Sequence, residues 1–135
     1  MQTENGKPVS KKTLWAGRII SALPILFLLF DGAMKLVKPA PVVEATVKLG
    51  YPEGTIVPLG RVLLVCTLLY AIPQTSVLGA MLLTGYLGGA VATHVRVGDP
   101  LFTHVLFPVY MGILIWLGIY LRDVRLRALA PVRTG

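Results

Sequence analysis

The sequence has little that would support redox or hydrolytic chemistry by this chain alone. Its single cysteine, Cys66, cannot form a disulfide within the chain, and no CxxC motif is present. The residue falls in the middle of an apolar run, where a packed and unreactive thiol is expected. A glycine-rich phosphate loop and the HExxH, GxSxG and CxxCH motifs are also absent. The sequence therefore favours a protein without stand-alone enzymatic activity and without an intrinsic cofactor.

Charged side chains are scarce too, and this scarcity argues against a soluble globular fold. Only 14% of the residues are charged, 55% are apolar, and the mean hydropathy is +0.74. The apolar residues gather in four runs, at residues 14–36, 56–72, 76–95 and 101–121. Each run is close to the ~20 residues that a helix needs to cross a bilayer. The alternating pattern of a transmembrane β-barrel is missing. The sequence therefore predicts an all-α, integral membrane four-helix bundle.

The segments between and beyond these runs are short. Residues 1–12 are polar and are expected to form a disordered cytoplasmic arm, residues 13–122 the transmembrane domain, and residues 123–135 a basic cytoplasmic tail. Pro39 and Pro41 end the first helix. Residues 42–49 then indicate a short amphipathic helix, in which Glu44 and Lys48 can pair one turn apart. This helix is too short to cross a bilayer, so we expect it at the interface or over the mouth of the bundle.

Positive residues flank the predicted helices, and the net charge is +7. Stacking aromatic residues are not interleaved with them, which argues against nucleic acid and leaves the lipid bilayer as the partner. With both termini in the cytoplasm, eight Lys and Arg residues lie inside: Lys7, Lys11, Lys12, Arg18, Arg122, Arg125, Arg127 and Arg133. Five lie outside: Lys35, Lys38, Lys48, Arg61 and Arg96. This excess of Lys and Arg on the side of the termini predicts a multi-pass protein with both termini in the cytoplasm.

Two local patterns predict details of the helices. Gly85 and Gly89 have the spacing of a GxxxG motif, which is typical of close packing between transmembrane helices. Asp99 is placed as the N-cap of the last helix and Pro100 as its first residue.

Other ionisable residues of the apolar runs would gather at the end of the bundle opposite the termini. The candidates for a polar, ligand-binding pocket there are Asp31, Lys35, Arg61, His94 and His104. Because a charge in hydrocarbon costs a few kcal/mol, such groups are functional candidates by default. They could bind an anionic group, relay a proton or hold a polar ring such as a quinone headgroup. Alternatively, they pair with one another and reach out to lipid headgroups. The two histidines lie on different predicted helices and lack further ligands, so no metal site is expected.

Several short motifs occur in a specific order along the chain. They are DGAMKL at residues 31–36, followed by Lys38 and Pro39, then LGYPE at 49–53, TGYLGGA at 84–90, and Thr93 with His94. Their order and spacing resemble the DoxX-like family of small bacterial membrane proteins over about residues 14–122. The resemblance implies four transmembrane helices in the inner membrane. It also implies a link to redox or thiol-stress complexes, because the family is named after a subunit of a thiosulfate:quinone oxidoreductase. Many relatives carry an acidic residue early in the second helix, where this chain has Arg61 and Leu63.

The leading interpretation is an accessory membrane subunit of a redox, quinone-linked system, acting with a partner protein or as a homo-oligomer. A small-molecule or proton-coupled transporter is the alternative from another class. Four-helix exporters depend on an acidic residue deep in the first span, whereas Asp31 lies near the far end of its helix, next to Lys35. A non-catalytic membrane scaffold is the third interpretation.

Overall fold

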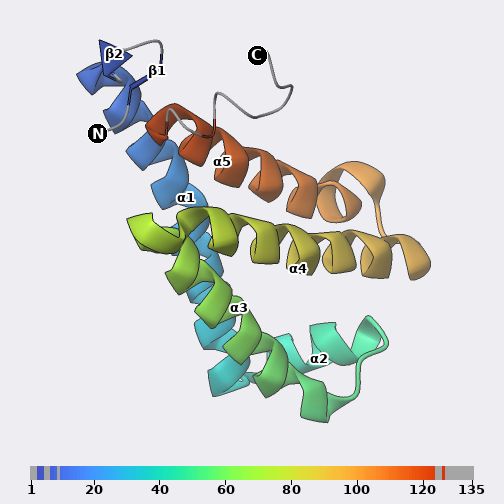
Figure 1. Ribbon diagram of the computed structural model, residues 1–135. Coiled ribbons are helices and arrows are strands. Elements are labelled where there is room, and N and C mark those ends of the chain that lie inside the picture. The colour runs from blue at the N-terminus through green and yellow to red at the C-terminus, as the bar shows by residue number, and fades with distance from the viewer. Residues whose placement is uncertain (1–2, 5–6, 9, 124–125, 127–135) are drawn as a thin grey trace.

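The computed structural model describes residues 3–4, 7–8, 10–123 and 126 of the chain (Figure 1). Near its N-terminus, β1 (Thr3–Glu4) pairs antiparallel with β2 (Lys7–Pro8). The α-helices are α1 (Lys11–Val37), α2 (Ala40–Lys48), α3 (Ile56–Ala71), α4 (Ser76–Arg96) and α5 (Phe107–Arg122). Two 3-10 turns, η1 (Glu53–Thr55) and η2 (Pro73–Thr75), precede α3 and α4, and a π-helical turn, η3 (Leu101–Val105), precedes α5.

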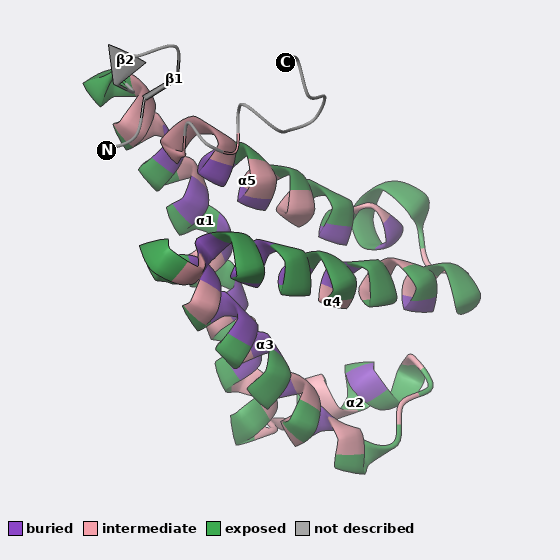
Figure 2. Ribbon diagram, viewed as in Figure 1, coloured by how far each residue is buried: buried purple, intermediate pink, exposed green. Residues whose placement is uncertain are grey.

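Four helical segments are long and apolar enough to cross a membrane, which confirms the predicted all-α bundle. Within the described residues they are Lys11–Val37, Glu53–Ala71, Pro73–Arg96 and Leu101–Arg122. The short helix predicted at residues 42–49 is present as α2. Large apolar side chains, among them Leu26, Phe30 and Phe102, are exposed on the outer faces of the bundle. This pattern, seen as exposed outer helix faces in Figure 2, suits a bundle surrounded by lipid.

The first helix begins earlier than predicted, whereas it ends just before Pro39, as predicted. Ser10 caps its N-terminus, because the Ser10 hydroxyl accepts a hydrogen bond from the Thr13 backbone N–H at 3.2 Å. Lys11 and Lys12 therefore belong to α1 rather than to the predicted arm. At the other end, Lys38 adopts a left-handed conformation with a φ of 58°, and its N–H donates to the Met34 carbonyl. The predicted tail at 123–135 lies outside the described residues, apart from positions 123 and 126.

The long helix α1 packs against two neighbours. It contacts α5 and α3, and α4 packs against both of these helices in turn (Figure 1). The crossing with α3 is close because Gly32 faces Gly60: a Cβ on Gly60 would lie 3.0 Å from the Gly32 carbonyl oxygen. The crossing with α5 is close at Gly118, where an added Cβ would overlap Ser21. Small residues therefore set both helix separations, as in other membrane bundles.

The glycines that the sequence selected for helix packing do not serve it within this chain. Gly85 and Gly89 are exposed on α4, and a Cβ added to either would meet no atom within 4 Å. The close helix packing predicted for this motif is therefore not made among the described residues. GxxxG spacing shows that two residues share a helix face, but not that this face is inward. The buried face of α4 instead includes Gly79, Leu83 and Leu87.

The core lies where the four long helices meet. It comprises Leu28, Leu63, Cys66, Tyr70, Ala80, Leu83, Leu87, Ile115 and Ile119. Cys66 is buried there, as the sequence predicted for a packing thiol. The Tyr70 ring is fully buried, and its hydroxyl donates to the Ile115 carbonyl oxygen at 2.7 Å and lies 3.0 Å from Ser21 Oγ. One side chain thus ties α3 to both α1 and α5.

The last span is interrupted, and its start differs from the prediction. The π-helical turn η3 covers Leu101–Val105, and α5 begins only at Phe107, with Pro108 in its first turn. Asp99 does not cap this segment, because Pro100 holds the N-cap position and no side chain caps the turn. The Asp99 carboxylate instead contacts His94 at the end of α4. The N-cap prediction was therefore wrong, since a histidine one turn back competes for the same carboxylate.

Candidate functional site

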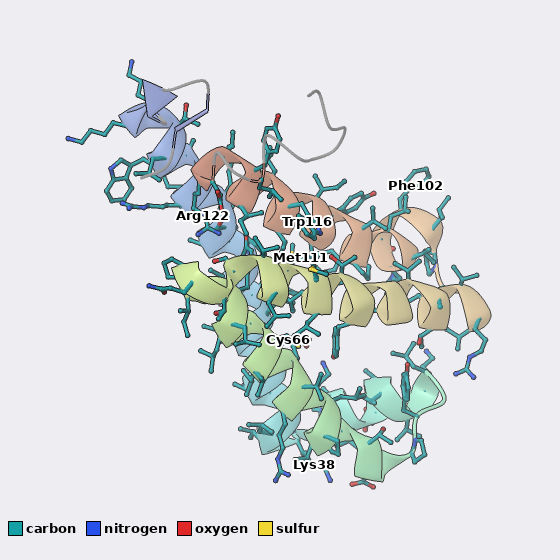
Figure 3. The ribbon with its side chains drawn as sticks, in the orientation of Figure 1. Lys38, Cys66, Phe102, Met111, Trp116 and Arg122 are labelled. Carbon is teal, nitrogen blue, oxygen red and sulfur yellow. The ribbon has the colours of Figure 1, made fainter. Side chains whose placement is uncertain are left out.

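The polar residues predicted to form a site lie at the end of the bundle that carries α2. We call this the α2 end; it holds the C-terminal ends of α1 and α4, the start of α3, and η3 (Figure 1). Lys38 lies at this end and Arg122 at the opposite end (Figure 3). The C-terminal ends of α1 and α4 diverge from one another in Figure 1. The structure therefore divides the five predicted residues into separate groups rather than one cluster.

The first group is an ion pair on α1. Lys35 Nζ donates to Asp31 Oδ2 at 2.8 Å, across one helical turn. The Lys35 side chain is 15% exposed and that of Asp31 is 38% exposed, so the carboxylate remains the more accessible partner. Asp31 also lies within electrostatic range of the Tyr86 phenol on α4. The pair itself lies entirely on α1.

Tyr86 also belongs to this region, although the sequence motifs did not identify it as a site residue. Its side chain is half-buried against the core, and it lies within electrostatic range of Tyr51 as well as of Asp31. Its hydroxyl has no hydrogen-bond partner among the described residues. A seven-residue step separates Tyr86 from Thr93, which places both on the same face of α4. This seven-residue spacing of polar residues in an apolar helix is the sequence feature by which Tyr86 could have been identified.

The second group joins the end of α4 to η3. His94 Nδ1 lies 2.5 Å from Asp99 Oδ2, and the Asp99 backbone N–H donates to the His94 carbonyl. The ring of His104 lies edge-on to that of His94, with centroids 5.8 Å apart and planes at 65°. His104 Nδ1 is 2.8 Å from the hydroxyl of Thr103. The structure thus brings together two histidines that the sequence placed on different helices.

Arg61 stands apart from both groups. It is exposed on the first turns of α3 and has no hydrogen-bond or ion-pair partner in the described part of the chain. Its neighbour Gly60 faces the bundle, which turns the next side chain away from the interior. Arg61 is therefore a surface cation at the α2 end.

Helix α2 and the turn after it bridge α1 and α4. Tyr51 Oη and Thr93 Oγ1 share a hydrogen bond of 2.7 Å, and the Arg96 guanidinium donates to the Leu49 carbonyl oxygen at 2.9 Å. Lys38 and Glu53 form an ion pair of 3.5 Å across the base of the segment. The turn after α2 is thus joined to α4 by two long-range hydrogen bonds.

We expect Tyr51→Phe to loosen this bridge without unfolding the bundle. The substitution removes one hydrogen bond, which typically contributes about 1 kcal/mol. Amide hydrogen exchange over residues 40–51 should accelerate severalfold in Tyr51→Phe, while exchange in α3 and α5 stays unchanged. Tyr110→Phe, which removes the exposed hydroxyl near the Phe102 carbonyl, serves as the control. Unchanged exchange over α2 would show that the Arg96 contact alone holds it.

These groups offer hydrogen-bond donors, acceptors and imidazoles at one end of an apolar bundle. Among the described residues, no three His, Cys, Asp or Glu side chains cluster closely enough to hold a metal ion by themselves. Asp31 lies within electrostatic range of Tyr86, whereas the histidine pair lies at the C-terminal end of α4. The two groups therefore lie in separate places on the bundle.

Comparison with known proteins agrees with the resemblance carried by the motifs. The sequence profile of the DoxX-like family matches residues 19–118, which is most of the chain and includes all four membrane-spanning segments in whole or in large part. Comparison with curated proteins and with solved structures gave no match. The matched region contains Asp31, Tyr86, the histidine pair and α2. The chain is a membrane protein with four spans, and it belongs to the DoxX-like family.

Proposed function

We propose that this protein is an accessory membrane subunit of a redox system and binds a quinone headgroup between α1 and α4 at the α2 end. The observation that carries the proposal is the Tyr86 hydroxyl. The Tyr86 side chain is half-buried, its hydroxyl lacks a hydrogen-bond partner among the described residues, and the residue lies within electrostatic range of Asp31. A polar hydroxyl in an apolar bundle is costly unless it is satisfied, so a bound polar group would stabilise it.

The chemistry of a quinone suits these side chains. The ring has two carbonyl oxygens that accept hydrogen bonds, and the Tyr86 hydroxyl is a donor within the bundle. Asp31 can accept a proton when the ring is in its quinol form, while Lys35 holds the carboxylate in place at 2.8 Å. An apolar quinone tail would lie along exposed side chains such as Leu36 on α1. Electron exchange is assigned to a partner subunit.

We place the site on the outer side of the inner membrane, with both termini in the cytoplasm. Eight Lys and Arg residues fall near the ends of the chain and five near the α2 end (Lys35, Lys38, Lys48, Arg61 and Arg96). Two of these five are held within the protein, since Lys35 pairs with Asp31 and Lys38 with Glu53. The larger number of Lys and Arg residues near the two termini favours cytoplasmic termini, because orientation follows the count of these residues rather than the net charge.

Binding of a short-tailed quinone tests the proposal directly. The protein is placed in lipid nanodiscs, and binding is followed by native mass spectrometry and by a radiolabelled quinone. Tyr86→Phe should weaken binding by about fivefold to tenfold, because it removes one donor and no volume. Asp31→Asn should weaken it further. Arg61→Gln, an exposed change at the same end, is the matched control and should bind as the wild type does.

Equal binding by wild type, Tyr86→Phe and Asp31→Asn would contradict the site. A proton-dependent substrate flux in proteoliposomes that disappears in Asp31→Asn would favour the transporter alternative instead. A partner protein that copurifies with the wild type but carries no redox centre would argue against the accessory redox role.

A further inference from the structure

His94 and His104 form a second feature of the α2 end, independent of the proposed quinone site. Their rings meet edge to face with centroids 5.8 Å apart. Two imidazoles that share one metal ion, each with a nitrogen at about 2.1 Å, have ring centres roughly 5 to 6 Å apart. The observed separation therefore falls in the range of a shared ion.

Both rings are oriented through the same nitrogen. His94 Nδ1 contacts the Asp99 carboxylate at 2.5 Å; because a carboxylate only accepts, this nitrogen carries a proton. His104 Nδ1 lies 2.8 Å from Thr103 Oγ1, which can accept a hydrogen bond from a protonated Nδ1 in the same way. The Nε2 atom of each ring has no partner among the described residues. Metal-binding histidines usually donate one ring N–H to a carboxylate or another acceptor and bind the metal through the other nitrogen.

The backbone between the two helices builds this arrangement. Gly98 takes a φ of 76°, which reverses the chain after α4. The Asp99 N–H then donates to the His94 carbonyl at 3.1 Å, so the carboxylate lies beside the ring of His94. The His104 N–H donates to the Pro100 carbonyl at 3.1 Å and fixes the first turn of η3. The eleven residues from His94 to His104 thus carry the two imidazoles and their orienting groups.

The charges around His94 and His104 are compatible with a bound cation. Asp99 supplies one negative charge beside His94, and the two imidazoles are neutral when they act as ligands. The nearest cation in sequence is Arg96, two residues beyond His94 and therefore on another face of α4. Its guanidinium is directed to the Leu49 carbonyl oxygen.

We propose that His94 and His104 bind one divalent late transition-metal ion through their Nε2 atoms, with Asp99 and Thr103 as orienting groups. Imidazole nitrogen suits Zn²⁺, Ni²⁺ and Cu²⁺. Two protein ligands leave coordination positions open to water or to an exogenous ligand. The site needs neither the quinone nor Asp31, so its test is separate from that of the proposed function.

The test uses the full chain, purified without a polyhistidine tag and treated with a chelator. The chain contains only two histidines, so every imidazole signal must come from this pair. Zn²⁺ binding is measured by calorimetry, and the Cu²⁺ complex by electron spin-echo envelope modulation, which detects the remote nitrogens of coordinated imidazoles. Wild type should bind one ion per chain and show two imidazoles.

Each ligand variant has a defined outcome. His94→Gln and His104→Gln should each lower Zn²⁺ affinity at least tenfold and leave one imidazole on Cu²⁺. Asp99→Asn should lower affinity about tenfold to a hundredfold while both imidazoles remain, since it acts through His94. Arg96→Gln is the control and should bind as wild type. His104 is exposed, so its variant tests the site without risk to folding. Wild-type protein without imidazole modulation, or a double His94→Gln/His104→Gln variant with unchanged affinity, would overturn the proposal.

Discussion

Gly79→Ala is expected to lower the free energy of unfolding by about 3 kcal/mol or more, at the upper end of overpacking effects in protein cores. A Cβ at this position would lie 2.5 Å from Tyr70 Cα and 2.8 Å from the Leu69 carbonyl carbon. These are backbone atoms of α3 beside the short connection through η2, and they cannot move aside as a flexible side chain can. Both helices are fixed there by the Ser76 hydroxyl, which donates to the Tyr70 carbonyl oxygen at 2.6 Å.

Gly85→Ala is the matched control, because it adds the same methyl group to the same helix. The added Cβ would meet no atom within 4 Å, so only helix propensity changes, by up to about 1 kcal/mol in favour of alanine. Both variants are measured by reversible unfolding in mixed micelles and by the amount of folded protein in membranes. Equal stability of Gly79→Ala and Gly85→Ala would contradict the close α3–α4 contact. A large loss for Gly85→Ala would instead indicate that this exposed face packs against another chain.

Tyr70→Ala is expected to destabilise the bundle by about 3–5 kcal/mol, the range for removing a large aromatic side chain from a core. Tyr70 is fully buried and is among the largest such side chains in the described residues. Its loss opens a cavity between α1, α3 and α5 and removes the hydrogen bonds to Ile115 and Ser21. The Arg122 guanidinium, 5.5 Å from the ring centroid, would also lose its aromatic contact.

Tyr70→Phe separates the two contributions, because it keeps the ring and removes only the hydroxyl. Interhelical hydrogen bonds in membrane proteins contribute about 0.6 kcal/mol on average and at most about 2 kcal/mol. We therefore expect Tyr70→Phe to retain most of the wild-type stability and Tyr70→Ala to lose most of it. Equal losses in the two variants would show that the hydrogen bonds, rather than ring packing, hold this junction.

The candidate site was predictable only in part from the sequence. The ion pair of Asp31 and Lys35 follows from their spacing, because residues four apart lie on one face of a helix. The contact between His94 and His104 cannot be predicted from the sequence, because it depends on the left-handed backbone conformation of Gly98 and on a π-helical turn. The α2 end was also expected to be a single polar pocket, whereas the helix ends diverge and leave Arg61 at the surface.

The sequence by itself determined the membrane environment, the four spans and the position of α2. These properties depend on composition and on the length of apolar runs, because a bilayer requires about 20 consecutive apolar residues with all backbone groups satisfied within the helix. Only the tertiary structure decided which face of each span is inside. In a membrane both the inner and the outer face of a helix are apolar, so hydropathy does not distinguish them. The fit between neighbouring helix backbones decides which face is buried. Gly32, Gly60, Gly79 and Gly118 are buried because backbones approach there, whereas Gly85 and Gly89, equally small, remain on the outer face of α4.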